Sequence, residues 1–207
     1  MPAEPRTTRL LALWAVCYGV THHLGLLPGG LGAAGGGTRW ADWLDLLVPY
    51  LVIGTALAAL SAVGTDTRGW VMAVVGAVMY AQGHGIHLAA NSVSNARGDG
   101  PPVHLWDEIV GHLLWYGGLA LIVVALAGAV AAAGLRLGRW SGAVAALTGI
   151  TWTTNALGAD GLIPAGLAGA AGLSAYGWRL RAGAAGRLLL LAYLPSAVGL
   201  SVASLVA

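Results

Sequence analysis

The chain has 207 residues, of which 57% are hydrophobic and only 9% are charged. This leaves too little polar surface to cover a water-soluble core, so the composition excludes an ordinary soluble domain and indicates a membrane protein. The formal net charge is +2, and all ten basic residues are arginines that flank apolar runs, which argues against a nucleic-acid partner. The single cysteine, Cys17, excludes an internal disulfide and a cysteine-built metal cluster.

Seven apolar runs follow one another along the chain, each close to the roughly 20 residues that span a bilayer as a helix. Segments rich in glycine and proline separate several of them. We therefore predict a single all-α, polytopic integral membrane domain over residues 1–207, built as a bundle of seven transmembrane helices. Its first part, 1–133, carries most of the polar side chains, and 134–207 is a Gly/Ala-rich scaffold. The seven runs are 10–27, 43–63, 69–90, 105–133, 140–157, 162–178 and 186–206.

The arginines predict the orientation of this bundle. With seven spans, eight arginines fall on one side, and only Arg39 and Arg97 fall on the other. The positive-inside rule makes the first side cytoplasmic, with the N-terminus in the cytoplasm and the C-terminus outside. The absence of lysine and phenylalanine beside 33 glycines is typical of a GC-rich bacterial genome, so we expect a multi-pass protein of a bacterial cell membrane. The eight arginines are Arg6, Arg9, Arg68, Arg136, Arg139, Arg179, Arg181 and Arg187.

The first run, 10–27, follows two arginines and so resembles a signal peptide. No convincing small-residue cleavage site follows it, and it contains His22 and His23. We expect it to be retained as the first helix.

Polar residues gather at the predicted extracytoplasmic ends of the spans, and all six histidines are among them. Ionisable groups at membrane depth are costly, which makes such a set a functional hypothesis. The set is His22, His23, Asp42, Asp45, His84, His87, Asn91, His104, Asp107, Glu108, His112, Asn155 and Asp160.

Helical spacing places the densest of these residues on two facing surfaces. Tyr80, His84, His87 and Asn91 share one face of the third span, and His104, Glu108 and His112 share one face of the fourth. A short loop joins these two spans, so the faces can meet. Imidazole nitrogens with a carboxylate form a typical ligand set for zinc or iron.

We therefore predict a metal site with ligands His84, His87, His112 and Glu108. Asp107, Glu108 and Asp45 are the expected catalytic carboxylates. Residues that could orient the ligands or contact the substrate are His22, His23, Asp42, Tyr80, Asn91, His104 and Asn155.

Simpler explanations stand beside this prediction. Asp107 and Glu108 lie near a helix start, where the macrodipole stabilises an acid without any function. His84 and His87 could be interhelical hydrogen-bonding groups. Asp42 could belong to an interfacial helix start, and His104 could be a solvated loop residue.

Three membrane families provide comparisons. Without lysine the chain cannot form the retinal Schiff base of rhodopsins. Its His and Asp-Glu content is similar to that of the ceramidase and adiponectin-receptor type of seven-helix zinc hydrolase, a likeness that implies zinc-dependent hydrolysis in the membrane. The late histidine pair of that type is missing, because no histidine follows His112. Transmembrane b-type cytochromes ligate haem through histidines on separate helices, and His84 or His87 opposite His112 or His22 could do this.

The expected function is therefore that of a membrane-embedded metal-dependent enzyme, a hydrolase or an oxidoreductase, with zinc or iron as cofactor. A lipid or other apolar small molecule is the expected substrate, reached from the extracytoplasmic face. The alternatives are a non-enzymatic haem- or metal-binding protein and a proton or ion pathway. The near absence of polar residues from the cytoplasmic half argues against conduction.

Overall fold

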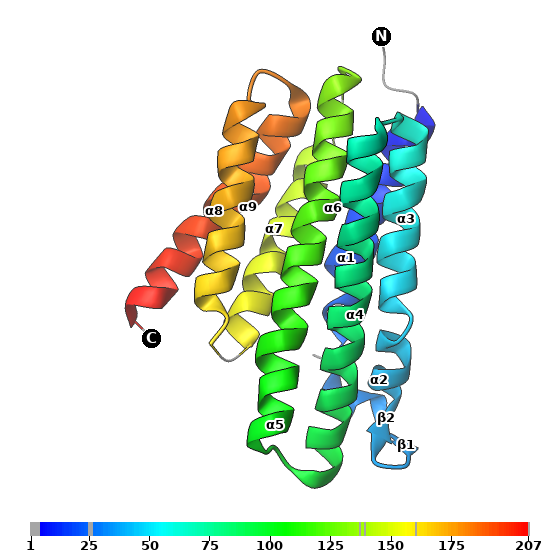
Figure 1. Cartoon of the computed structure of the whole chain (residues 1–207), viewed down its shortest axis with the longest axis vertical. Helices are drawn as coiled ribbons and strands as arrows, with labels where there is room; N and C mark the ends of the chain where they lie inside the picture. Colours follow the sequence, from blue (N-terminus) through cyan, green and yellow to red (C-terminus); the bar gives the residue numbers. More distant parts are fainter. Residues whose placement is uncertain (1–4, 25–26, 137, 139, 160, 207) are drawn as a thin grey trace.

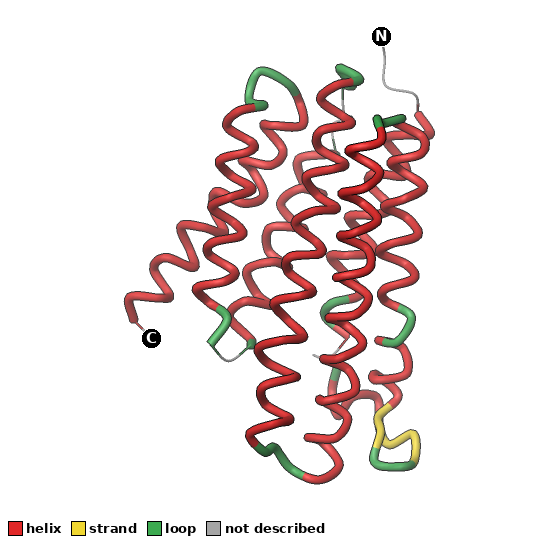
Figure 2. Tube along the Cα trace, in the orientation of Figure 1, coloured by secondary structure: helices red, strands yellow, loops and turns green. Residues whose placement is uncertain are grey.

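The computed structural model describes residues 5–24, 27–136, 138, 140–159 and 161–206. Arg139 and Asp160, which the sequence analysis placed at opposite ends of the bundle, lie outside the described residues. The described chain is almost entirely helical, apart from a small hairpin of strands β1 (Ala33–Gly35) and β2 (Thr38–Arg39) (Figure 2).

Helices overlap each of the seven predicted apolar runs, and the all-α prediction is confirmed. Two runs are divided: the second into α2 and α3, and the fourth into the π-helical segment η3 and α6, which the short helix α5 precedes. The elements are α1 (Pro5–Thr21), the short 3-10 helix η2 (Pro28–Leu31), α2 (Trp40–Asp45), α3 (Val48–Val63), α4 (Thr67–Arg97), α5 (Pro101–His104), η3 (Leu105–Gly111), α6 (His112–Ala132), α7 (Ser141–Gly158), α8 (Ile163–Arg179) and α9 (Ala184–Val206).

Four helical stretches in the described residues are long and apolar enough to cross a membrane, which agrees with an integral membrane protein. They are Trp40–Val63, Thr67–Arg97, Pro101–Ala132 and Ala184–Val206. The count of seven spans and the orientation of the termini stay predictions.

Local sequence signals explain where α4 begins and ends. Asp66 caps α4 by accepting a hydrogen bond from the backbone N–H of Gly69 at 2.9 Å. Gly98 ends the helix with a φ of 86°, a conformation that glycine adopts without steric cost. The chain then turns within a few residues into Pro101 and Pro102, and proline suits the first turn of a helix. The turn places the last turns of α4 beside η3 (Figure 1).

Alternating helix directions bring the histidines to one end of the bundle, opposite the start of α1 (Figure 1). The end of α1, the hairpin, α2, the second half of α4 and the segment α5–η3 meet there. The start of α1, the start of α4, the end of α6 and the α8–α9 connection lie at the other end. The predicted separation of histidines from most arginines therefore appears in the fold, although no membrane side is assigned by it.

Glycines allow α4 and α6 to approach closely, and these helices form the most extensive helix–helix contact. A Cβ atom at Gly83 would collide with the backbone of Gly111 and Trp115, and one at Gly118 would collide with the backbone of Tyr80. Small residues at a helix–helix interface permit such close approach. Gly85, two residues after Gly83, is exposed and faces open space.

Candidate functional site

His87, Asp107 and His112 meet where α4 crosses η3 and the start of α6. Nδ1 of His87 lies 2.5 Å from Oδ1 of Asp107. Nδ1 of His112 lies 2.9 Å from the backbone carbonyl oxygen of Asp107, and the centroids of the two imidazole rings are 4.5 Å apart. Asp107 and His112 are buried, with 6% and 5% exposed surface. The predicted meeting of the third and fourth apolar runs therefore occurs.

The π-helical segment η3 determines which carboxylate faces the histidines. A π-turn closes between residues i and i+5, and such turns are frequent at functional sites. Residues five apart, such as Asp107 and His112, thereby come to lie over each other, whereas the α-helical period predicted this relation for Glu108. Glu108 is less buried, and its Oε2 lies 3.9 Å from Nδ1 of His112. The acid closest to the histidines is thus Asp107.

His84 and Asp45 form a second contact beside this centre. Nε2 of His84 lies 3.0 Å from the backbone carbonyl oxygen of Asp45 and 3.4 Å from its Oδ2. His84 is buried, and its Nδ1 has no hydrogen-bond partner among the described residues. Asp45 ends the short helix α2, so this contact joins α2 to α4.

His22 is held by two tyrosines. Its Nδ1 lies 2.8 Å from the backbone carbonyl oxygen of Tyr18, so this nitrogen must donate a proton. The hydroxyl of Tyr80 lies 2.7 Å from Nε2 of the same ring. With Nδ1 protonated, Nε2 of a neutral His22 accepts the Tyr80 hydroxyl. Both nitrogens of His22 are then used within the bundle.

The same reasoning assigns protons on the rings of His112, His84 and His87. A carbonyl oxygen can only accept, so His112 donates through Nδ1 and His84 donates through Nε2. Two lone pairs at 2.5 Å would repel each other, so we assign a proton to Nδ1 of His87 beside Oδ1 of Asp107, although these two atoms lack hydrogen-bond geometry. In their neutral forms, His87 and His112 keep a lone pair on Nε2, and His84 keeps one on Nδ1. These are the three histidines that the sequence analysis predicted as metal ligands.

Trp115 lies among four imidazoles, of which His84 and His112 are buried and His22 and His87 are half-buried. Its ring centroid is 4.7 Å from that of His22, 5.3 Å from His112, 5.5 Å from His84 and 5.9 Å from His87. The sequence analysis did not place this tryptophan at the site. Its position one turn after His112, facing the glycine contact, was the available signal for a place inside the bundle.

The remaining predicted residues lie around this centre with other partners. Asp42 is bound by Arg39, with Oδ1 and Nη2 2.7 Å apart, and this pair caps the start of α2. His104 lies 3.5 Å from Asp99 in the α4–α5 connection. Nε2 of His23 lies 3.4 Å from the hydroxyl of Thr151.

Two asparagines complete the predicted set. Asn91 accepts a hydrogen bond from Asn95 at 3.0 Å, one turn further along α4. Asn155, on α7, approaches the side chain of Tyr18. Neither contacts the His87–Asp107 pair through a hydrogen bond between described residues.

A small cavity of about 90 Å³ opens beside His84 and His87. Arg39 and Asp42, which form an ion pair, both line this cavity. The sequence analysis used Arg39 only to predict the orientation of the bundle. The cavity is lined by His22, Arg39, Ala41, Asp42, Asp45, His84, His87, Asn91 and Trp115.

A metal ion would need several of these side chains to point at one place. Within the described ranges, no three side chains of His, Cys, Asp or Glu are arranged to hold a metal ion. His87 and His112 adjoin each other, while His84 is directed toward Asp45. The four predicted ligands lie in one region, and their coordination of a common ion stays a prediction.

Comparison with known proteins gives no relative for this chain: no family model, no curated protein and no solved structure matches it.

Proposed function

We propose that this protein is a membrane-embedded metal-dependent enzyme whose centre consists of His87, His112 and Asp107. The observation that carries the proposal is that one aspartate lies beside Nδ1 of two adjoining imidazoles from two helical segments, and hydrogen-bonds one of them. Its carboxylate faces His87 and its carbonyl oxygen binds His112. Metal-binding histidines are typically held in this way by a carboxylate or carbonyl on the nitrogen that does not bind metal.

His84 and Glu108 are the further ligands in this proposal. His84 keeps a lone pair on a buried Nδ1 that has no hydrogen-bond partner among the described residues. Burying a polar atom without a partner costs folding free energy, unless the atom binds a ligand. Glu108 lies one turn before His112. Because these groups do not converge in the present arrangement, metal binding requires side-chain rotations of His84 and Glu108.

A bound zinc or iron ion would polarise a substrate oxygen and lower the pKa of a bound water toward about 7. Asp107 keeps the tautomers of its two imidazoles fixed. Glu108 can accept a proton from the attacking water, and Asp45, which contacts His84, can hold a charge near the cavity. Hydrolysis and oxidation are both compatible with this set of residues.

The proposed substrate is a lipid or another apolar molecule, because the centre lies within helices that have the length and hydropathy of membrane spans. Haem is the alternative cofactor. The adjacent cavity of about 90 Å³ is far below the roughly 300–1,000 Å³ of ordinary ligand sites, which favours an ion over a macrocycle. A proton pathway receives less support, because the ionisable cluster is confined to one end of the bundle.

The experiment is metal analysis of detergent-purified protein after loading with zinc or with ferrous iron. We expect about one ion per chain in the wild type and in Gln82→Ala, because Gln82 is exposed on the same helix. His87→Ala should lose most of the metal. Equal losses in both variants, with loss of helical signal, would mean unfolding, and retention of metal in folded His87→Ala would exclude the proposed centre.

A further inference from the structure

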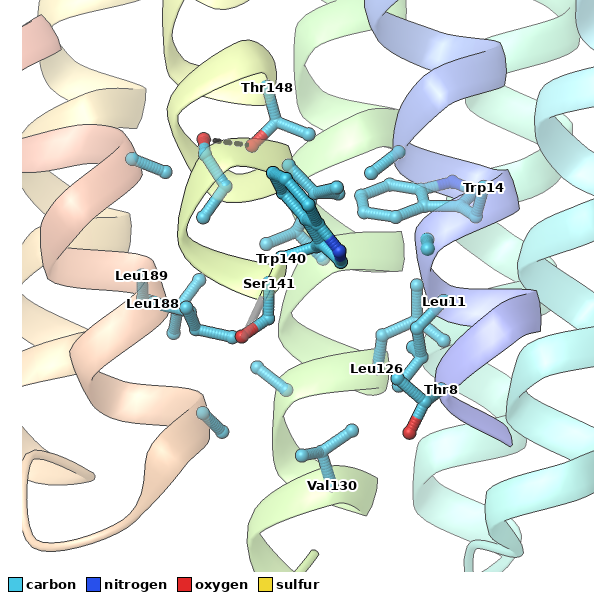
Figure 3. A pocket seen from close by; sticks show the side chains of 18 of the residues that line it. Thr8, Leu11, Trp14, Leu126, Val130, Trp140, Ser141, Thr148, Leu188 and Leu189 are labelled. Atoms are coloured by element: carbon cyan, nitrogen blue, oxygen red, sulfur yellow. Dashed lines mark hydrogen bonds between the residues drawn. The ribbon is translucent and has the colours of Figure 1, made fainter. Parts of the chain in front are cut away.

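A large apolar cavity lies at the end of the bundle opposite the histidines. Its volume is about 980 Å³, at the upper limit of ordinary small-molecule sites. Four helices provide its walls, through side chains such as Leu11 on α1, Leu126 on α6, Thr148 on α7 and Leu189 on α9 (Figure 3).

The inner part of this cavity suits a hydrocarbon chain. Polar groups are few there: the Thr148 hydroxyl donates to the carbonyl oxygen of Ala145 at 2.7 Å, and the indole Nε1 of Trp14 has no hydrogen-bond partner among the described residues. Figure 3 shows the six-membered ring of Trp14 turned toward Trp140 across the cavity. A ligand in this part gains apolar contact and loses no hydrogen bond.

Two arginines give the cavity a positive charge. Arg9 and Arg136 belong to its lining, and both are exposed. Its described lining contains no aspartate or glutamate, and neither arginine forms an ion pair with a described residue. The charge is therefore available for an anionic group next to an apolar chamber.

We propose that this cavity binds one anionic phospholipid of the surrounding leaflet, with an acyl chain against α6 and α7 and the phosphate at Arg9 and Arg136. An apolar chamber with two arginines fits an anionic amphiphile, whereas a zwitterionic lipid brings a positive group to the same arginines. The site is separate from the His87–Asp107 centre, and it does not depend on the metal-enzyme proposal.

Titration of the full chain, purified in non-ionic detergent, with phosphatidylglycerol and with phosphatidylcholine tests this site. Native mass spectrometry counts the lipids bound to each molecule. We expect one tightly bound phosphatidylglycerol molecule per chain and weaker binding of phosphatidylcholine. Arg9→Gln and Arg136→Gln should each weaken phosphatidylglycerol binding about fivefold, the usual effect of one basic residue near an anionic lipid surface, and leave phosphatidylcholine unchanged.

Two matched controls separate this site from lipid that coats the bundle. Arg68 is exposed at the same end of the bundle but does not line the cavity. Arg68→Gln should therefore leave the affinity for phosphatidylglycerol unchanged. Ala12→Trp fills the cavity and should abolish the tight lipid, whereas Val16→Trp, exposed on the same helix, should not. Equal effects of Arg68→Gln and Arg9→Gln, or tight lipid retained in folded Ala12→Trp, would overturn the proposal. If Ala12→Trp fails to fold, the three arginine variants decide.

Discussion

Asp107 and His87 contact each other across the interface between α4 and the column formed by η3 and α6, with Oδ1 and Nδ1 2.5 Å apart. The two residues lie on different helical segments that run antiparallel, so the periodicity of either segment alone does not pair them. Their contact depends on the close approach of the helix backbones at Gly83 and Gly111. Helix packing and the arrangement of the polar centre are therefore linked.

Asp107→Asn should destabilise the protein by about 2 kcal/mol, because a buried charged acceptor is replaced by a neutral one. The measurement is thermal unfolding in detergent, followed by circular dichroism. Asp99→Asn is the control, since Asp99 is exposed in the α4–α5 connection and its pair with His104 is worth little. Similar losses in both variants would mean that burial of the Asp107 pair has no energetic importance.

Gly83→Ala should destabilise the α4–α6 contact by about 1–3 kcal/mol, because the added methyl group meets backbone atoms that cannot move independently. It should also lower metal binding by separating His87 from Asp107. Gly85→Ala, two residues further on, meets nothing and should be neutral or slightly stabilising. Thermal unfolding and metal content of both variants are compared. A neutral Gly83→Ala would show that the helices can separate without cost.

Tyr80→Phe should cost about 1–2 kcal/mol of stability, because it leaves Nε2 of the half-buried His22 without its partner. Metal content should not change, since His22 has no nitrogen left for an ion. Tyr50→Phe is the matched control at an exposed position. Loss of metal in folded Tyr80→Phe would place His22 or Tyr80 among the residues that hold the ion.

Cysteine labelling in intact cells tests the predicted orientation. In a Cys17→Ala background, we expect Asp99→Cys to react with a membrane-impermeant reagent from outside the cell. Ala133→Cys, at the other end of α6, should react only after the membrane is opened. Both positions are exposed. Labelling of both from outside would contradict the opposite placement of these two ends.

The sequence predicted the helical columns well, because apolar length is a strong signal for membrane helices. It did not predict the division between α2 and α3, since Leu46 and Leu47 continue the apolar run. It also did not predict η3: residues 105–111 carry no mark of a π-turn, and the α-helical period therefore assigned Glu108, rather than Asp107, to the histidine face.

The polar centre was predictable only in part, for a similar reason. Helical spacing gives the residues that share a face, and it correctly joined His87 to the region of His112. It does not give the partner of each nitrogen. That His22 is occupied by Tyr80, and that Trp115 lies among the imidazoles, depends on how α1 and α6 pack against α4. Packing of this kind has no periodic signature in one sequence.

The most direct test of the proposed centre is metal stoichiometry, measured together with thermal stability, for the wild type, His87→Ala, His112→Ala and the double variant. If both histidines hold one ion, each single variant should lose most of the metal affinity, and the double variant should lose little more, because ligands of one site act as a unit. Additive stability losses with unchanged metal content, or a wild type that binds no metal under any loading condition, would contradict the proposal.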